Sequence, residues 1–151
     1  MKKILSGLLA LALCLSLTAC GGTEETPFDP AADAKTLLDS GAFTDGLEEI
    51  SLDIACTLYG IDESTVSDSA VYGSTGATAE ELAIFTFSNH DDAGAALAAL
   101  QNRVADRKEA LAGYQPNEVA KLEKAVTETR GNSVLLVIAA DYAPVEAFLK
   151  G

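Results

Sequence analysis

The strongest constraint on the fold is a run of six apolar residues, Val-Leu-Leu-Val-Ile-Ala, at positions 134–139. Successive side chains of a strand point to opposite faces, so this run is apolar on both faces and is expected near the centre of a sheet. Residues 124–129 precede it, and Arg130-Gly131-Asn132 separates the two segments. This pattern predicts a β-hairpin with strands at 124–129 and 133–140.

Two further strands are expected earlier in the chain. Residues 69–72 and 82–87 flank the turn residues Gly73-Ser74-Thr75-Gly76, and the second segment contains two phenylalanines, which favour strands. We therefore expect these two segments to pair. Residues 48–58 fit either a strand or one face of a helix, and we favour a helix in the second half that ends at Gly60.

The longest helix is predicted at 90–111, where Asn89 is a suitable N-cap and Gly113 follows the last turn. Its larger apolar residues recur at helical spacing, and alanines on its flanks would allow close packing on a sheet. Shorter helices are predicted at 31–38, 117–122 and 143–149. The chain is therefore predicted to form an α+β domain, with a four-stranded, mostly antiparallel sheet and helices packed on one face.

The first residues are typical of a secretory signal. Lys2 and Lys3 precede an uncharged run at 4–19, and a basic start followed by an apolar stretch is the pattern of an export signal. The run has 16 residues, fewer than the roughly 20 that a membrane-spanning helix needs. We therefore expect residues 1–19 to form a signal peptide that precedes the folded domain.

The sequence Leu17-Thr18-Ala19-Cys20 resembles the lipobox of bacterial lipoproteins. The resemblance implies cleavage after Ala19 and two or three acyl chains on Cys20, and two chains are enough for stable anchoring. An ordinary signal peptide in which Cys20 has no special role is the alternative. We expect a lipoprotein on the extracytoplasmic face of the cell membrane, with the lipidated Cys20 and a short tether at 20–30 and a single domain at 31–151.

The chain is strongly acidic, with a formal net charge of −13. Loss of residues 1–19 removes Lys2 and Lys3 and no acid, which leaves 8 basic and 23 acidic residues and a net charge of −15. No Lys/Arg cluster offers the basic surface that nucleic-acid binding needs, so we expect no nucleic-acid partner. We interpret the acidity mainly as a source of solubility, and cation binding is the alternative.

Four short motifs resemble small bacterial lipoproteins that contain the domain of unknown function 4358. The motifs are Leu58-Tyr59-Gly60-Ile61, the segment VYGSTGATAEEL from Val71 to Leu82, Tyr114-Gln115-Pro116 and Gly131-Asn132. The resemblance covers about residues 35–150 and implies the same lipoprotein architecture. It implies no activity and no site residues, so the candidate sites rest on the residues alone.

The turn at Gly73–Gly76 and its flanks are the first candidate for a binding site. The residues that would form it are Tyr72, Ser74, Thr75, Glu80 and Glu81. Small residues let a loop cradle an anion, but this loop lacks the lysine of a P-loop, and the two glutamates would oppose a phosphate. A turn that only connects paired strands is the alternative.

Other candidate chemistries are weaker. His90, Asp91 and Asp92 are adjacent at a helix start, where side chains diverge, whereas zinc needs three or four converging ligands. The acidic loop from Asp62 to Asp68 lacks the spacing of an EF-hand. Cys56 lies among apolar residues, which favours a buried and inert thiol over a nucleophile. We therefore predict no metal site, no cofactor and no catalytic residue.

The small single domain and the lack of a convergent catalytic set favour a non-catalytic binding module. Its expected contacts are the membrane, through the lipid on Cys20, and an envelope component or a protein partner. A lipoprotein that binds a small ligand or a cation is the alternative. An envelope hydrolase is the third possibility.

Overall fold

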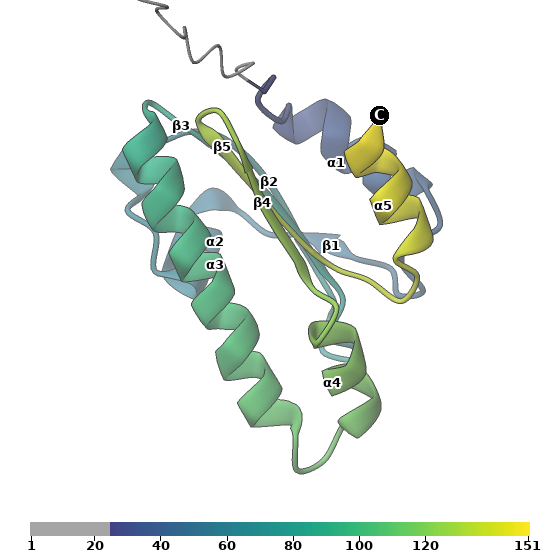
Figure 1. The fold of residues 1–151 in the computed structure, drawn as a ribbon. Helices are drawn as coiled ribbons and strands as arrows, with labels where there is room; N and C mark the ends of the chain where they lie inside the picture. The colour runs from purple at the N-terminus through teal and green to yellow at the C-terminus, as the bar shows by residue number, and fades with distance from the viewer. Residues whose placement is uncertain (1–24) are drawn as a thin grey trace, which may run out of the picture.

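The computed structural model describes residues 25–151, and its centre is a five-stranded antiparallel sheet with the strand order β1-β2-β3-β5-β4 (Figure 1). The predicted signal peptide and lipobox at residues 1–20 lie outside the described residues. The strands are β1 (Glu48–Glu49), β2 (Val66–Gly73), β3 (Glu81–Phe87), β4 (Val126–Arg130) and β5 (Ser133–Ile138). The helices are α1 (Pro30–Asp39), α2 (Leu52–Tyr59), the 3-10 helix η1 (Glu63–Thr65), α3 (His90–Leu111), α4 (Pro116–Leu122) and α5 (Ala143–Lys150).

The predicted α+β class is confirmed, and the apolar run at 134–139 lies inside the sheet as expected. Strand β5 pairs with β3 on one side and with β4 on the other. Every residue of β5 is buried. The predicted hairpin and the predicted pairing of the segments around 69–72 and 82–87 are also confirmed.

Two details of the fold differ from the prediction. The sheet has five strands rather than four, because Glu48 and Glu49 pair with the end of β2. Helices cover both faces of the sheet rather than one (Figure 1): α2, α3 and α4 lie on one face, and α1 and α5 lie on the other. The physical reason is that β3 and β5 are apolar at successive positions, so both faces must be removed from water.

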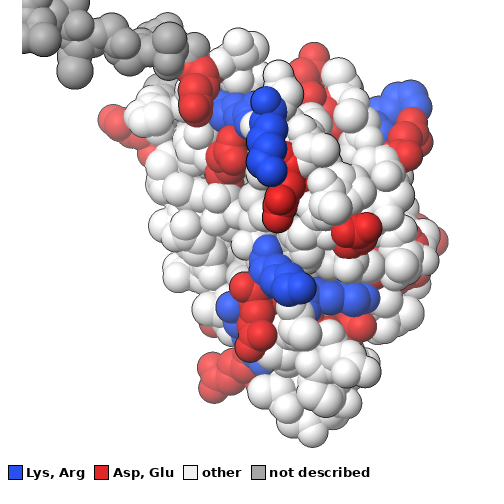
Figure 2. Space-filling view, turned by 45° about the vertical axis from the view of Figure 1, so that its right-hand side comes forward, with Lys and Arg blue, Asp and Glu red and all other residues white. Residues whose placement is uncertain are grey.

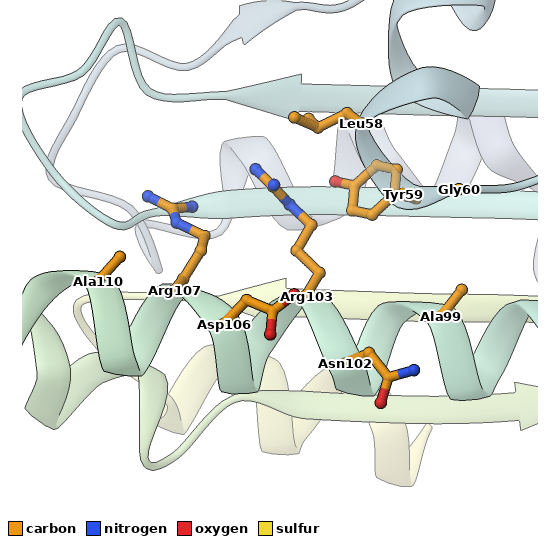
Figure 3. A pocket seen from close by; sticks show the side chains of 9 residues that line it. All are labelled: Leu58, Tyr59, Gly60, Ala99, Asn102, Arg103, Asp106, Arg107 and Ala110. Carbon is orange, nitrogen blue, oxygen red and sulfur yellow. The ribbon is translucent and has the colours of Figure 1, made fainter.

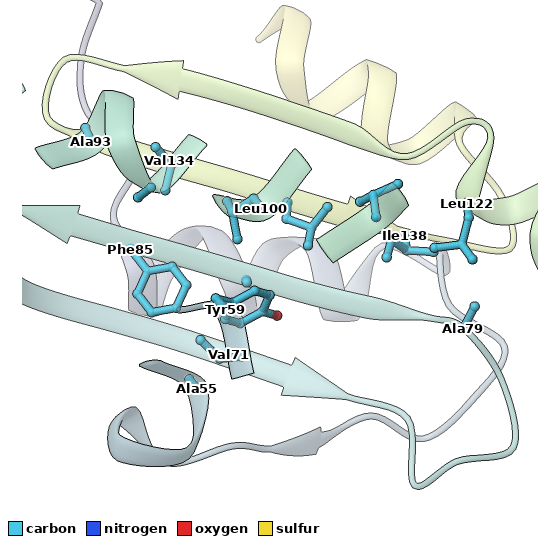
Figure 4. Close-up of a cluster of buried hydrophobic side chains, with 14 of the residues drawn as sticks. Ala55, Tyr59, Val71, Ala79, Phe85, Ala93, Leu100, Leu122, Val134 and Ile138 are labelled. Carbon is cyan, nitrogen blue, oxygen red and sulfur yellow. The ribbon is translucent and has the colours of Figure 1, made fainter. Parts of the chain in front are cut away.

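Each face of the sheet has its own hydrophobic core. On the face of α3, Phe85 and Ile138 from the sheet pack with Leu100 from the helix (Figure 4). On the other face, Leu37 of α1 and Val145 of α5 belong to a second cluster with side chains of β3 and β5. Successive residues of β3 and β5 therefore belong alternately to one core and to the other.

Helix boundaries follow local sequence signals. The side chain of Asn89 accepts a hydrogen bond from the backbone N–H of Asp92, which caps the start of α3 as predicted. Segment 48–58, whose sequence fitted both a strand and a helix, contains one of each: strand β1 at its start and most of helix α2 in its second half. Helix α2 ends at Gly60, whose φ of 70° lies in the left-handed region that favours glycine.

The segment before α1 is fixed against the β4–β5 hairpin. Phe28 is only 3% exposed, and its backbone N–H donates to Ser133 Oγ at 2.7 Å. The Arg130 guanidinium lies 4.6 Å from the centre of the Phe28 ring, and the Phe148 ring stacks at 6.2 Å. The packed region therefore includes Phe28, ahead of the boundary expected at residue 31.

No helix within residues 25–151 combines the length and the apolar character that a membrane crossing requires.

Candidate ligand-binding groove

Glu80 and Glu81 are adjacent in sequence but serve opposite faces of the sheet. Both are buried, with exposed fractions of 0% and 2%. Because side chains alternate along an extended chain, Glu81 projects to the face of α3 and Glu80 to the face of α1. A buried carboxylate needs partners that replace its lost hydration, and each of the two has a separate set.

Glu81 is bound by three side chains from two helices. Arg103 of α3 makes a bidentate pair with it, Nε to Oε1 at 2.8 Å and Nη2 to Oε2 at 2.8 Å. Arg107 Nη1 donates to Oε2 at 2.6 Å, and the Tyr59 hydroxyl of α2 donates to Oε1 at 2.7 Å. A carboxylate has about four acceptor positions, so this cluster of Glu81, Tyr59, Arg103 and Arg107 satisfies all of them.

The spacing of the two arginines explains how one helix supplies both. Arg103 and Arg107 are four residues apart, which places them one above the other on the same side of α3. Leu100 and Val104 of the same helix are buried in the core, so the arginines lie along its border. Their side chains retain exposed fractions of 18% and 23%.

Burial and charge fix the protonation states within the cluster. Burial is the largest influence on Tyr59, and together with the negative charge of Glu81 it raises the phenol pKa well above its usual value of 10.0. Burial alone would lower the pKa of Arg103, but the hydrogen bond and the charge of Glu81 outweigh it and raise that pKa. Tyr59 is therefore a hydrogen-bond donor at neutral pH, and Arg103 is a cation.

Two connected hollows lie over this cluster, and together we call them the groove. The helix hollow, of about 420 Å³, lies between α2 and α3, and Figure 3 shows Arg103 and Arg107 reaching from α3 towards the strands and Tyr59. The loop hollow, of about 510 Å³, continues towards the β2–β3 loop and the residues after α3. The two share Leu58, Arg103, Arg107 and Ala110. Sites of roughly 300–1,000 Å³ accommodate small molecules or short peptide segments.

The rim of the groove carries exposed apolar side chains. Leu58 lines both hollows and is 39% exposed. Ile54, one turn earlier in α2, is 57% exposed but lines neither hollow. Tyr114 lines the loop hollow and is 67% exposed. Among the described residues these are the large apolar side chains with the greatest exposure. The groove thus combines a cationic floor with an apolar rim.

Glu80 belongs to a different network, on the other face of the sheet. Its carboxylate accepts hydrogen bonds from the backbone N–H groups of Thr44 and Asp45, from the Thr44 hydroxyl, and from Lys121 Nζ at 2.8 Å. Burial alone would raise the pKa of Glu80, but these hydrogen bonds outweigh it and lower the pKa from 4.5 to about 2. This network links the segment after α1 to α4, and the Glu80 side chain lines neither hollow of the groove.

The β2–β3 loop is held by its own hydrogen bonds. Ser74 Oγ donates to Asp45 Oδ2 at 2.5 Å, and the backbone N–H of Thr78 donates to Ser74 Oγ at 3.0 Å. The backbone N–H of Ala79 donates to Glu118 Oε2 at 2.7 Å. Ser74 is therefore already occupied as a donor, and the loop forms a preformed wall of the groove.

The structure separates the residues that we predicted as a binding site. Ser74 and Glu81 line the loop hollow. Glu80 is on the opposite face, and Tyr72 packs against the core of that same face. Thr75 is exposed at the tip of the loop and does not line either hollow.

The sequence reasoning missed Tyr59, Arg103 and Arg107 as site residues. The available signal was an arginine pair at a spacing of four within an alanine-rich helix, together with a glutamate that begins an apolar strand. A buried acid in a strand requires a cation from a neighbouring element, and this pair was the candidate.

The weaker alternatives from the sequence, a metal site and a cysteine nucleophile, involve residues that lie apart. His90 Nδ1 contacts the backbone carbonyl of Gly131 at 2.6 Å rather than facing Cys56. Cys56 is buried, and burial followed by the charges of Glu63 and Asp62 raises the pKa of its thiol. Within residues 25–151, no three His, Cys, Asp or Glu side chains come together closely enough to hold a metal ion.

Several basic side chains lie beside acidic ones. Lys121 contacts Glu118 as well as Glu80, and Arg130 contacts Glu128 at 2.7 Å. On the face drawn in Figure 2, blue and red side chains are interspersed, with uncharged surface between them.

A family model described as "Domain of unknown function (DUF4358)" matches residues 39–139. The chain belongs to the DUF4358 family. The resemblance expected from the four short motifs is thus confirmed at the level of the domain, and no curated protein or solved structure matches the chain. The matched region of the DUF4358 domain runs from the end of α1 to just beyond β5 and contains every residue that lines the groove.

Proposed function

We propose that this protein is an extracytoplasmic lipoprotein, anchored through Cys20, whose DUF4358 domain is a non-catalytic binding module. The observation that carries the proposal is the pair Arg103 and Arg107, fixed on the buried Glu81 at the floor of the groove. Such a preordered pair lowers the entropy lost when a ligand binds. The groove is the proposed ligand site.

The same cluster favours binding over catalysis. The acceptor positions of Glu81 are all occupied by donors, so this carboxylate has no free lone pair for a general base. Tyr59 stays protonated because of its raised pKa. Cys56 is buried with a raised thiol pKa, which disfavours a nucleophilic thiolate.

The groove proposal predicts that a bulky side chain at Ala110 abolishes ligand binding. Ala110 lines both hollows and is exposed, so the substitution Ala110→Phe fills the groove without disturbing the core. Thermal unfolding of the full chain in detergent would be followed against peptides, sugars, peptidoglycan fragments and divalent ions. A ligand at a hundred times its dissociation constant stabilises a protein by about 2.7 kcal/mol, and we expect this stabilisation in the wild type but not in Ala110→Phe.

Ala105→Phe is the matched control, since Ala105 is exposed on the same helix but does not line the groove. It should respond to the ligand as the wild type does. A ligand that stabilises all three proteins equally would place the binding site elsewhere. Conversion of the ligand to a product by the wild type would show that the module is an enzyme.

The anchor proposal predicts that Cys20→Ser leaves an uncleaved or mislocalised precursor that lacks the mass of the acyl groups. Serine offers no thiol for thioether lipidation, so the variant gains no acyl chains and keeps the apolar run at 4–19 of its signal peptide. Fractionation of cells and the intact mass of the purified protein measure the result. An unchanged mass and unchanged membrane retention in Cys20→Ser would refute the lipoprotein.

A further inference from the structure

We infer that the loop hollow binds a single carboxylate carried next to an apolar side chain, as at the C-terminus of a peptide that ends in an apolar residue. The inference rests on the proposed function, because it names the ligand class for the same groove. Its first observation is the set of donors at the floor. Arg103 Nη1 and Arg107 Nη2 make no hydrogen bond to any residue in the described part of the chain.

The local charge points to a ligand with one negative charge. Glu81, Arg103 and Arg107 are the charged residues among those that line the loop hollow, and together they carry a net charge of +1. The whole chain has a net charge of −13, so this hollow departs from the sign of its surroundings. One carboxylate would neutralise the floor, whereas a dianionic phosphate would leave an excess negative charge beside the buried Glu81.

The geometry of the donors also suits a carboxylate. Glu81 occupies Nε and Nη2 of Arg103 and Nη1 of Arg107, which fixes both guanidinium planes and leaves one Nη nitrogen of each arginine without a partner among the described residues. Two such N–H donors match the two oxygens of one carboxylate. The helix hollow is less suitable, because Asp106 joins its lining and opposes an anion there. The anion is therefore assigned to the loop hollow rather than to the groove as a whole.

The rest of the loop hollow provides an apolar surface beside the cationic floor. Ile50, Leu58 and Leu111 line it together with the exposed ring of Tyr114. An apolar group placed there would leave water while its neighbouring carboxylate reached the arginines. An ion pair alone or an apolar contact alone gives little affinity at a partly exposed site. The ligand is therefore expected to carry both a carboxylate and an apolar group.

The test compares two probes that differ in one charge. N-acetyl-leucine carries a carboxylate beside an apolar side chain, and N-acetyl-leucine amide is its neutral counterpart. The full chain in detergent would be titrated with each while the Nε–Hε resonances of its arginines are followed by NMR. We expect saturable shifts for Arg103 and Arg107 with a dissociation constant of about 1 mM for the carboxylate, and binding at least about ten times weaker for the amide.

Two further probes identify the source of the carboxylate. Tighter binding of N-acetyl-leucine than of N-acetyl-glutamyl-leucine amide supports a peptide C-terminus as the ligand. The reverse order supports an acidic side chain within a peptide. Both results support a carboxylate next to an apolar side chain. Tighter binding of inorganic phosphate than of both would overturn it. Equal shifts with N-acetyl-leucine and its amide would also overturn it, yet would leave the groove as a binding site for neutral ligands.

A variant pair assigns the effect to the cluster. Arg107→Gln removes one cation while the bidentate pair of Arg103 with Glu81 remains, and we expect at least a tenfold loss of affinity for N-acetyl-leucine. Lys108→Gln removes a positive charge from the next position of α3, outside the lining of the groove, and should leave the affinity unchanged. Equal losses in both variants would indicate general electrostatics and would overturn the assignment. The comparison of the two leucine probes on the wild type does not depend on either variant folding.

Discussion

Replacing Glu81 by glutamine is expected to lower the free energy of unfolding by about 3 kcal/mol. The substitution leaves Arg103 and Arg107 without a counter-charge at the border of the core, and removing one partner of a buried ion pair typically costs about 3–5 kcal/mol. The lower end of that range applies because both arginines are partly exposed and can regain water. For a domain of this size, the midpoint of thermal unfolding should fall by about 10 °C.

Glu109→Gln is the control for this prediction. Glu109 is an exposed residue of the same helix, so its substitution removes the same charge without breaking a buried cluster. It should change the free energy of unfolding by less than about 0.5 kcal/mol. An equally small effect of Glu81→Gln would mean that the cluster contributes little to stability and that the arginines find other partners.

Acidification is expected to destabilise the protein through Glu80. Its pKa is about 2 in the folded state and near 4.5 when unfolded, so the stabilisation is fully present above pH 4.5 and is lost as the pH falls from 4.5 towards 2. A difference of this size corresponds to about 3 kcal/mol. Urea unfolding of the wild type at a series of pH values between 7 and 2 measures the loss.

Other carboxyl groups titrate over the same range, so the effect of Glu80 is isolated by comparison with a variant. In Glu80→Gln the stability at neutral pH should already be lower by about 3 kcal/mol, and the difference from the wild type should shrink below pH 4.5. Glu123→Gln, at an exposed position directly after α4, should follow the wild-type curve. A constant difference between wild type and Glu80→Gln at every pH would show that the pKa of Glu80 is not lowered by folding.

Elements with strong local signals could be predicted from the sequence. The run at 134–139 is short, rich in β-branched residues and apolar at every position, which favours an interior strand. Asn89 followed by a long helical pattern indicated the start of α3. Strand β1 has two residues, and the pattern at 48–58 fitted a helix as well as a strand, so the sequence did not separate β1 from α2. The prediction of helices on one face only was wrong. A strand that is apolar on both faces needs helices on both faces of the sheet, and this consequence of the β5 sequence was not drawn.

The candidate site was harder to predict because it depends on long-range packing. Glu80 and Glu81 were treated as neighbours in one loop, although the alternation of β3 already assigns them to different faces. The partners of Glu81 come from α2 and α3, 22 to 26 residues away in either direction. Which helix faces which glutamate follows from how the helices lie on the sheet, and no local pattern specifies that.

The fixed position of Phe28 determines how the domain would stand on a membrane. Glu25 and Pro27 lie against Gly131 of the β4–β5 turn, and five residues from Cys20 to Glu25 can span at most about 18 Å whatever their conformation. With the lipid that we propose on Cys20, the β4–β5 turn would be held close to the bilayer. The β2–β3 loop is at the other end of the sheet (Figure 1), so the loop hollow would open away from the lipid, towards molecules that arrive from the cell wall.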